Sequence, residues 1–405
     1  MRILLVGINY APELTGIGKY SGEMCEWLVS NGHEVRVVSA PPYYPEWKTH
    51  GNYSAWSYRY EEIKGVKVWR CPLWVPSRPS GLKRIIHLAT FAVSSLPVIL
   101  RQVFWKPDVV ITIEPPFFCA PAALICTKLS GAKGWLHVQD FEIDAAFELG
   151  ILRSRWMRSF ANWVESWVMR RFDRVSTISP KMLQRLLIQK GVTASKTILF
   201  LNWVDTGAIF PLNEPSPMRA QLDIPSSRIV ALYSGNMGEK QGLEVVLESA
   251  TKLSRDKNIL FILCGDGAAR VRLQMQYAKL DNVIWLPLQP LEQLNHLLNM
   301  ADIHLLPQRS GAADLLMPSK LTGMLSSGRP VIATADEGTQ IAEVLLDCGV
   351  VVKPDDVEQF SSAILQLARD VDKRSRLGRD AREYALKNWA MDSVLQEFDR
   401  QLKGL

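Results

Sequence analysis

The chain has 405 residues, a length typical of two or three domains. Hydrophobic residues make up 47% and charged residues 22%, so each half can bury a sizeable core, and a disordered, collagen-like or coiled-coil chain is excluded. The six cysteines form no C-x-x-C pair, which argues against structural zinc and a disulfide scaffold and favours a reducing cytoplasm.

Charge and tryptophan are unevenly distributed along the chain. The net charge is +6, but residues 1–205 hold 25 Lys and Arg against 16 Asp and Glu, whereas residues 206–405 hold 22 against 25. Residues 1–205 also contain 11 of the 13 tryptophans. A basic, Trp-rich first half favours an anionic surface or an anionic substrate as its partner.

Short apolar runs alternate with helical patterns throughout. The first series of strand-like runs is Ile3–Val6, Val35–Ser39, Val66–Arg70, Val109–Ile113, Trp135–Val138 and Val175–Ile178. The second is Val230–Tyr233, Ile259–Leu263, Val283–Leu286, Ile303–Leu306, Val331–Ala333 and Val350–Val352. This alternation predicts two α/β domains with doubly wound parallel sheets. Proline, serine and asparagine cluster between residues 211 and 227, so we predict domains at 1–205 and 206–375, followed by helices over 376–405.

Neither a targeting segment nor a membrane-spanning helix is predicted. The apolar start Ile3–Val6 is too short for a signal peptide. The apolar stretch Ile85–Leu100 contains His87, Pro97 and several hydroxyl side chains, whereas a span needs about 20 mostly apolar residues. We consider residues 85–105 a candidate for contact with a membrane surface instead.

Residues 153–171 form a second candidate for membrane contact. Trp156, Phe160, Trp163 and Trp167 share one face of a helix, and five arginines surround them. An interfacial helix often has this pattern, but so does a core-facing stripe with a solvated basic side. The sequence leaves both interpretations open.

Loops that follow the predicted strands are where a doubly wound sheet binds its ligands. The segment 7–20 joins a strand to a helix and carries Gly16 and Gly18, which would let a phosphate approach the backbone. The segment 137–144 places His137 and Asp140 at a strand end, where Asp140 could orient a hydroxyl or act as a base. Its alternating acids could ligate a metal, or Glu142 and Asp144 could simply cap a helix.

Three loops of the second half could hold a charged nucleotide. Residues 234–242 carry several glycines, with Asn236 and Lys240 among them, a composition that suits a diphosphate. A Gly265-Asp266-Gly267 turn ends the next strand and could line a nucleoside. The segment 307–320 carries Arg309, Asp314, Ser319 and Lys320. Each loop alone is as consistent with a surface turn; their joint placement at successive strand ends is the stronger argument.

Several segments resemble the retaining glycosyltransferases of family 4. They are GINYAPELTGIGKY at 7–20, GHEV at 32–35, APPYYPEWK at 40–48, Asn202-x-x-Asp205, GNMGEKQGLE at 235–244, GDG at 265–267 and PSKLTGMLSSGRPVIAT at 318–334. The resemblance implies a GT-B fold, with an acceptor-binding N-terminal domain and a C-terminal domain that binds the nucleotide sugar. It also implies that the last helix crosses back to the N-terminal domain and that no metal or other cofactor is needed.

The chain departs from the family pattern in three places. Many members have Arg where Asn236 stands and Lys where Gln241 stands, so Lys240 or Lys320 would supply the charge. The two family glutamates fall on Leu315 and Gly323, with Asp314 as the nearest acid. The usual strand-end histidine aligns better with Gln139 than with His137.

These patterns together predict a glycosyltransferase of exopolysaccharide assembly. The donor would be a nucleoside-diphosphate sugar, with GDP-fucose as one option, and the acceptor a polyprenyl-diphosphate-linked saccharide at the cytoplasmic face of the membrane. Asp140, His137 and Asp314 are the candidate catalytic residues, and no nucleic-acid partner is expected. The alternatives are a sugar-nucleotide epimerase of the same fold, a nicotinamide-dependent oxidoreductase, which the lack of G-x-G-x-x-G argues against, and a binding-only scaffold.

Overall fold

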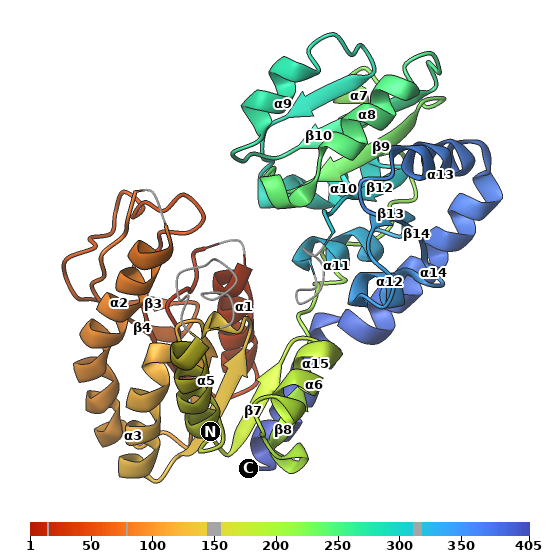
Figure 1. The fold of residues 1–405 in the computed structure, drawn as a ribbon. Helices are drawn as coiled ribbons and strands as arrows, with labels where there is room; N and C mark the ends of the chain where they lie inside the picture. Colours follow the sequence, from red (N-terminus) through yellow and green to blue (C-terminus); the bar gives the residue numbers. More distant parts are fainter. Residues whose placement is uncertain (14–15, 78–79, 144–154, 311–317) are drawn as a thin grey trace. The chain divides into compact units, whose positions relative to one another are not determined.

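The computed structural model describes the whole chain except residues 14–15, 78–79, 144–154 and 311–317. The chain divides into two compact units (Figure 1). The first unit comprises Met1–Leu201 and Leu395–Leu405, and the second comprises Asn202–Val394. Of the C-terminal helices expected over 376–405, most of the last one, from Leu395 onward, therefore belongs to the first unit.

The first unit is built on an eight-stranded sheet in the order β3-β4-β2-β1-β5-β6-β7-β8. Its strands are β1 Arg2–Val6, β2 Glu34–Ser39, β3 Arg59–Ile63, β4 Val66–Arg70, β5 Val109–Glu114, β6 Lys133–Val138, β7 Arg174–Thr177 and β8 Thr197–Leu199. All neighbours are parallel except β3 and β4, which form an antiparallel hairpin at one edge. Val6 of the central strand pairs with Val38 on one side and Thr112 on the other.

Helices cover both faces of this sheet. They are α1 Gly16–Ser30, α2 Gly81–Arg101 with the 3-10 turn η1 Gln102–Trp105, α3 Ala120–Ser130, α5 Arg155–Met169, α6 Pro180–Ile188 and α15 Met391–Lys403. Strand side chains alternate between faces, so β6 shows which helix lies where. Trp135 meets Phe398 of α15 at 4.9 Å between ring centroids, whereas Leu136 packs in one cluster with Met169 of α5. Figure 1 shows α2, α3 and α5 side by side on one face.

The second unit has a six-stranded, fully parallel sheet in the order β11-β10-β9-β12-β13-β14. Its strands are β9 Ile229–Ser234, β10 Ile259–Cys264, β11 Val283–Leu286, β12 Ile303–Leu306, β13 Val331–Thr334 and β14 Gly349–Val352. Strand β10 is apolar along its whole length and every residue of it is buried, as expected for a strand covered on both faces.

The helices of the second unit are α7 Pro217–Gln221, α8 Glu244–Lys252, α9 Arg270–Gln276, α10 Leu294–Met300, α11 Ser319–Ser326, α12 Gln340–Leu345, α13 Val357–Arg369 and α14 Val371–Trp389. Side-chain caps mark several starts: the carboxylates of Asp356 and Asp370 accept hydrogen bonds from the first turns of α13 and α14. The predicted class, two α/β units with parallel sheets, is confirmed. All six cysteines are free and buried.

One helix among the described residues, Gly81–Trp105, is long and apolar enough to cross a membrane by length and composition alone. Of the most apolar 18-residue stretch of this helix, 28% is buried inside the structure.

Candidate functional site

Two glycine-rich loops of the second unit are joined by backbone hydrogen bonds at the carboxyl ends of β9 and β10. Gly235 N donates to Cys264 O at 2.9 Å, and Met237 N donates to Asp266 O at 2.7 Å. The main chain of Met237 also accepts a bond from Ala269 N at 2.9 Å. The predicted segments 234–242 and 265–267 thus form one continuous backbone surface, which is where a doubly wound sheet binds ligands.

Glycine is required in this surface because the two backbones touch. A Cβ on Gly265 would lie 2.0 Å from Gly235 O, and a Cβ on Gly267 would lie 2.5 Å from Met237 O. Both glycines also have positive φ angles, 141° and 153°. The sequence pattern suggested that these glycines give access to a nucleoside; the structure gives them a packing reason that holds with or without a ligand.

Lys320, in the first turn of α11, extends to the end of β9. Its Nζ donates to the hydroxyl of Tyr233 at 3.3 Å and lies 4.3 Å from the centre of that ring. No charged partner among the described residues offsets its burial, which lowers the pKa of its ammonium to about 7. An ammonium held beside a glycine-rich backbone without a carboxylate is suited to an anion. Tyr233, which positions it, was missed because a strand tyrosine gives no functional signal in the sequence.

Lys240 and Asn236 occupy the exposed part of the first loop. The loop is held by Gln241, whose Oε1 accepts a hydrogen bond from Gly238 N at 3.0 Å. Gln241 stands where many family members have lysine, so this chain uses the position to brace the loop. Lys240 O accepts a bond from Arg309 N at 3.2 Å, which brings the segment 307–309 alongside.

The side chain of Arg309 is engaged by acidic residues. Its guanidinium lies 3.3 Å from a carboxylate oxygen of Glu244 and 3.8 Å from one of Glu239. Arg272 pairs with the same two carboxylates at 2.7 and 3.1 Å. The hydrogen bonds from Arg272 and Arg309 outweigh burial and lower the pKa of Glu244. The predicted donor contact of Arg309 would therefore compete with this surface network.

Of the remaining predicted residues of the second unit, Asp266 and Ser319 are exposed. The carboxylate of Asp266 accepts a hydrogen bond from Gly267 N at 2.8 Å and so shapes its own turn. Ser319 begins α11 one residue before Lys320. Asp314, predicted as catalytic, lies outside the described residues, as does Leu315.

In the first unit, the loop after β1 is organised around Glu13, a residue that the sequence analysis missed. Glu13 is buried, and its carboxylate accepts hydrogen bonds from Tyr43 N, Tyr44 N and Asn9 Nδ2 at 2.9–3.0 Å. Burial raises the pKa of Glu13, and the bonds from the two tyrosine amides oppose this. A Cβ on Gly18 would lie 2.6 Å from Glu13 Oε2, so Gly18 leaves room for this carboxylate.

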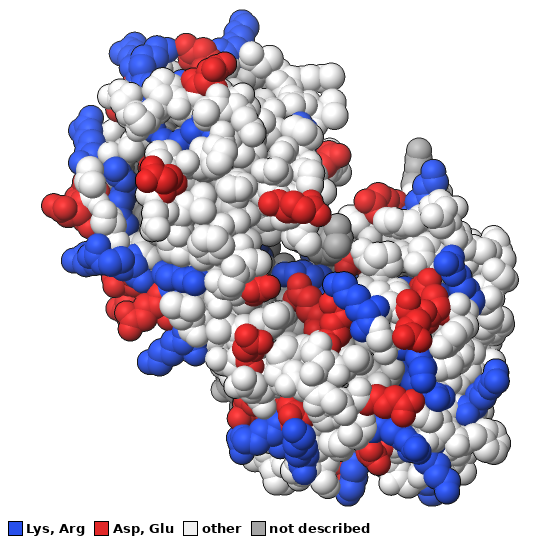
Figure 2. Space-filling view, turned by 180° about the vertical axis from the view of Figure 1, so that it is seen from behind, with Lys and Arg blue, Asp and Glu red and all other residues white. Residues whose placement is uncertain are grey.

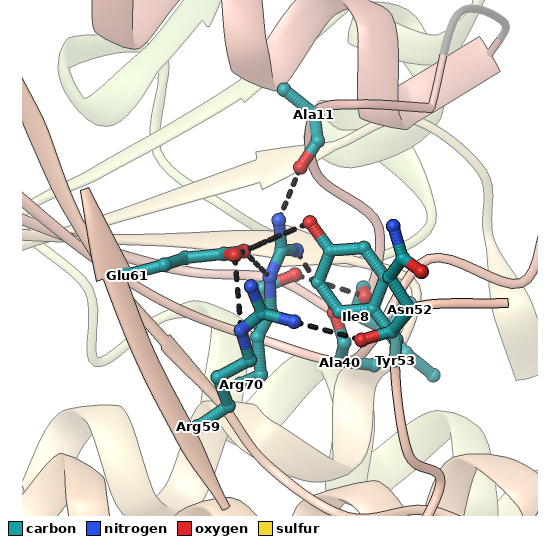
Figure 3. A network of polar contacts seen from close by, with 9 residues as sticks. Ile8, Ala11, Ala40, Asn52, Tyr53, Arg59, Glu61 and Arg70 are labelled. Carbon is teal, nitrogen blue, oxygen red and sulfur yellow. Dashed lines mark hydrogen bonds and ion pairs between the residues drawn. The ribbon is translucent and has the colours of Figure 1, made fainter. Parts of the chain in front are cut away.

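A buried arginine, Arg70, ties the same loop to the sheet (Figure 3). Its Nε donates to Glu61 at 2.7 Å, one terminal nitrogen donates to Ala40 O at 2.9 Å, and the other donates to Ala11 O. Arg70 thus connects β4, the β3 edge and the loops at 7–20 and 40–48. Gly16, at the start of α1, has a φ of 59°, and a Cβ there would lie 3.7 Å from the ring of Tyr44.

The loop after β6 places the predicted catalytic pair in different settings. His137 is buried in the strand; its Nδ1 lies 2.8 Å from Ser176 Oγ and its Nε2 lies 2.9 Å from the side-chain amide of Gln139. Burial lowers its pKa to about 3, so the ring is neutral. This favours a role in orienting Gln139 over proton exchange with a substrate. Asp140 is the second residue after the strand and is partly exposed.

Two further carboxyl groups lie at the same sheet edge. Glu142 accepts a hydrogen bond from Phe117 N at 2.7 Å, and burial raises its pKa to about 7. Glu114, at the end of β5, is fully buried, and its pKa is raised well above the ordinary value by burial and then by the charges of Glu165 and Glu142. Of the two roles that the sequence left open for Glu142, metal ligand or helix-terminal acid, the second agrees with its place at a helix start, and its carboxylate also holds the backbone after β5. Asp144 lies outside the described residues.

No group of three or more His, Cys, Asp or Glu that could hold a metal ion is found in the part of the chain that the structure describes. The predicted donor residues of the second unit are brought to one end of its sheet. Gly16, Gly18, His137 and Asp140 lie at the corresponding end of the first sheet.

Comparison with known proteins decides the family. Residues 15–203 match the glycosyl transferase 4-like domain, and residues 216–384 match the glycosyl transferases group 1. The chain is 44% identical, over the full length of both proteins, to WcaI of Escherichia coli (strain K12), a glycosyl transferase whose name assigns it provisionally to colanic acid biosynthesis. This chain therefore belongs to the family of glycosyltransferases that includes WcaI. It is also 27% identical to the glycosyltransferase WbjE of Pseudomonas aeruginosa, over 67% of this chain and 66% of WbjE.

Solved structures of glycosyltransferases share the fold over the whole chain. Sucrose-phosphate synthase from Thermosynechococcus elongatus has a TM-score of 0.76 at 16% identity, covering 100% of this chain and 98% of that one. WaaG, a glycosyltransferase of lipopolysaccharide biosynthesis, has a TM-score of 0.68 at 15% identity, with both chains fully covered. Anabaena HepE, solved with UDP and glucose, has a TM-score of 0.70 at 14% identity, also with full coverage. The GT-B fold implied by the sequence is therefore confirmed.

Proposed function

We propose that this glycosyltransferase moves a sugar from a nucleoside-diphosphate sugar to a polyprenyl-diphosphate-linked saccharide in exopolysaccharide assembly. The observation that carries the donor half is Lys320, an ammonium placed beside Tyr233 and the Gly235 backbone with no described carboxylate to neutralise it. The relationship to WcaI supports the exopolysaccharide half, because that relative is named for colanic acid biosynthesis.

The second unit would bind the donor diphosphate. In the transfer, the bond from the anomeric carbon to the diphosphate oxygen breaks, and the acceptor hydroxyl oxygen bonds to that carbon and passes its proton to the departing diphosphate. Negative charge then develops on the leaving diphosphate. Lys320 and Lys240 would stabilise it, and charge stabilisation of this kind is usually the largest catalytic contribution. We propose retention of anomeric configuration, as the family resemblance implies, and a reaction without a metal.

The first unit would bind the acceptor. Asp140 would orient the acceptor or the transferred sugar, and His137 would position Gln139 beside it. The Gly16 loop, held by Glu13 and Arg70, would form the adjoining wall. Two donors should be tested. GDP-fucose comes first because of the colanic acid relative, and UDP-glucose comes second because HepE is solved with UDP-glucose.

Nucleotide affinity tests the donor assignment. We expect wild-type protein to bind UDP or GDP by isothermal titration calorimetry, and Lys320→Ala to lose at least about tenfold in affinity, because a charge-assisted contact contributes about 1.5–3 kcal/mol. Lys320→Arg should recover part of the loss. Lys279→Ala, at an exposed lysine after α9, is the matched control and should bind as wild type does. Unchanged affinity in Lys320→Ala would refute the assignment.

A further inference from the structure

The outer layer of the first unit carries an unusually large amount of exposed apolar surface. On α2 and the turn that follows it, Leu82, Ile86, Val93, Leu96 and Phe104 are all exposed, with Val93 at 73% and Phe104 at 88%. The first four follow one another at steps of four, seven and three residues, which keeps them on one side of the helix, and Phe104 lies in the turn after it. No charged residue lies between Ile85 and Leu100, so the stripe is uninterrupted over four turns.

The neighbouring helices continue this surface. Phe118 before α3, and Ile125 and Leu129 within it, are exposed. On α5 the exposed residues are Trp156, Phe160, Trp163 and Trp167, which follow one another at helical spacing. The ring centroids of Phe160 and Trp163 lie 6.1 Å apart in a stacked arrangement, and those of Trp163 and Trp167 lie 6.4 Å apart. The core-facing interpretation of this stripe is therefore wrong: α5 packs on the sheet through Val168 and Met169 instead.

The helices that carry this surface are basic, although Asp108 and Asp173 follow two of them in the chain. Among all residues of α2, η1, α3 and α5, the one acid is Glu165, which is buried and paired with Lys190. The exposed basic residues at the helix ends are Lys83, Arg84, Arg101, Lys106, Lys128, Arg158, Arg170 and Arg171. Figure 2, which views the molecule from behind, shows acidic and basic side chains interspersed on the face that it displays.

We propose that the outer face of α2, α3 and α5 docks in the plane of a bilayer that contains anionic lipid. Exposed aromatic and aliphatic side chains enter the headgroup boundary, tryptophan is favoured there, and the basic rim meets the lipid phosphates. A soluble protein rarely leaves an apolar patch of this extent uncovered. The inference rests on the first unit alone and does not depend on the transfer reaction.

The buried side of α2 determines how this helix lies at the bilayer. His87, Phe91 and Ile99 are completely buried against the sheet, and Trp74 O lies 2.6 Å from Nδ1 of His87. A spanning arrangement of residues 81–105 would remove these side chains from the core. The helix therefore lies flat, with its inner side on the sheet and its outer stripe in the lipid.

Vesicle sedimentation with the full chain tests the proposal. We expect binding to phosphatidylcholine vesicles that contain phosphatidylglycerol, weaker binding to phosphatidylcholine alone, and a decline as salt is raised. Val93→Glu and Trp163→Glu, on separate helices and both exposed, should each lower the partition coefficient about tenfold or more. Leu346→Glu, at a residue of the second unit that is 78% exposed, is the matched control and should bind as wild type does.

Three outcomes would overturn the proposal. Equal loss of binding in Leu346→Glu would show that the effect is not confined to this face. Bound protein that resists extraction with alkaline carbonate would indicate a spanning helix. Absence of vesicle binding, together with a wild-type dimer that Val93→Glu converts to a monomer, would assign the face to a second copy of the chain. Because nucleotide affinity is measured without lipid, failure here leaves the donor assignment standing.

Discussion

Replacement of Gly265 by alanine is the sharpest test of the joined loops in the second unit. The new Cβ would lie 2.0 Å from Gly235 O, whereas real carbon–oxygen contacts are longer by more than an ångström, so the two loops must separate. Separation weakens the bonds from Gly235 N to Cys264 O and from Met237 N to Asp266 O. Neither side of the clash is a flexible side chain that could move away.

The expected loss can be estimated from these contacts. A non-glycine residue at a φ of 141° costs about 1–3 kcal/mol, and overpacking in a rigid site costs about 1–3 kcal/mol more. We therefore expect Gly265→Ala to lower the free energy of unfolding of the second unit by about 4 kcal/mol. Gly338→Ala is the matched control, because its φ is 72° and its Cβ would meet nothing within 4 Å. It should cost about 1 kcal/mol, which is the cost of the left-handed conformation alone.

Urea denaturation followed by circular dichroism measures both variants, with separate transitions fitted for the two units. The same samples should be titrated with UDP and GDP, since the displaced backbone is the proposed donor surface. If the free energy of unfolding of Gly265→Ala lies within about 1 kcal/mol of that of Gly338→Ala, the loops are not in backbone contact and the geometry of the donor surface is wrong.

Three further predictions concern single side chains. The pKa of Glu142 is raised from 4.5 to about 7, so the folded state keeps a proton that the unfolded state releases. Glu142 should therefore contribute a fall in stability of about 3 kcal/mol as pH rises from 4.5 through 7. Glu142→Gln, compared by thermal unfolding across that range, should remove this contribution and leave the one from Glu114. An unchanged pH profile would contradict the buried carboxyl. Arg70→Met should destabilise the first unit by about 2–4 kcal/mol in urea titrations, because it leaves two backbone carbonyls without their donor, whereas Glu61 keeps Tyr53 and Arg59; a loss below about 1 kcal/mol would contradict the network. Lys240→Ala, at an exposed side chain, should change stability by less than about 0.5 kcal/mol yet weaken calorimetric UDP or GDP binding, and equal affinity would remove Lys240 from the donor site.

Much of the fold is predictable from the sequence because parallel strands buried on both faces appear in it as apolar runs. Runs such as Val109–Ile113 and Ile259–Leu263 fall within β5 and β10. Two edge strands were missed for the complementary reason. β3, Arg59–Ile63, is polar and largely exposed, and β8, Thr197–Leu199, has three residues, so neither has a buried face to leave a pattern.

The candidate site was predictable in position and less so in detail. Strand-end glycines and lysines mark the loops, but the partners that fix them lie on other elements: Tyr233 lies 87 residues before Lys320, and Glu61 lies nine before Arg70 on another strand. Glu13 and Gln241 act through backbone amides, which side-chain identity does not reveal. The sequence pattern of Trp156 and Trp163 was equally compatible with a core or a surface, and only burial distinguishes these.

Sugar transfer itself tests the central claim most directly. Wild-type protein should move labelled sugar from a GDP- or UDP-linked donor into an organic-extractable, polyprenyl-diphosphate-linked saccharide, with release of the nucleoside diphosphate. Lys320→Ala should lower the rate by about 100-fold, as expected when a group that stabilises transition-state charge is removed. Label that never enters the lipid-linked fraction with any such donor, or an unimpaired Lys320→Ala enzyme, would contradict the account.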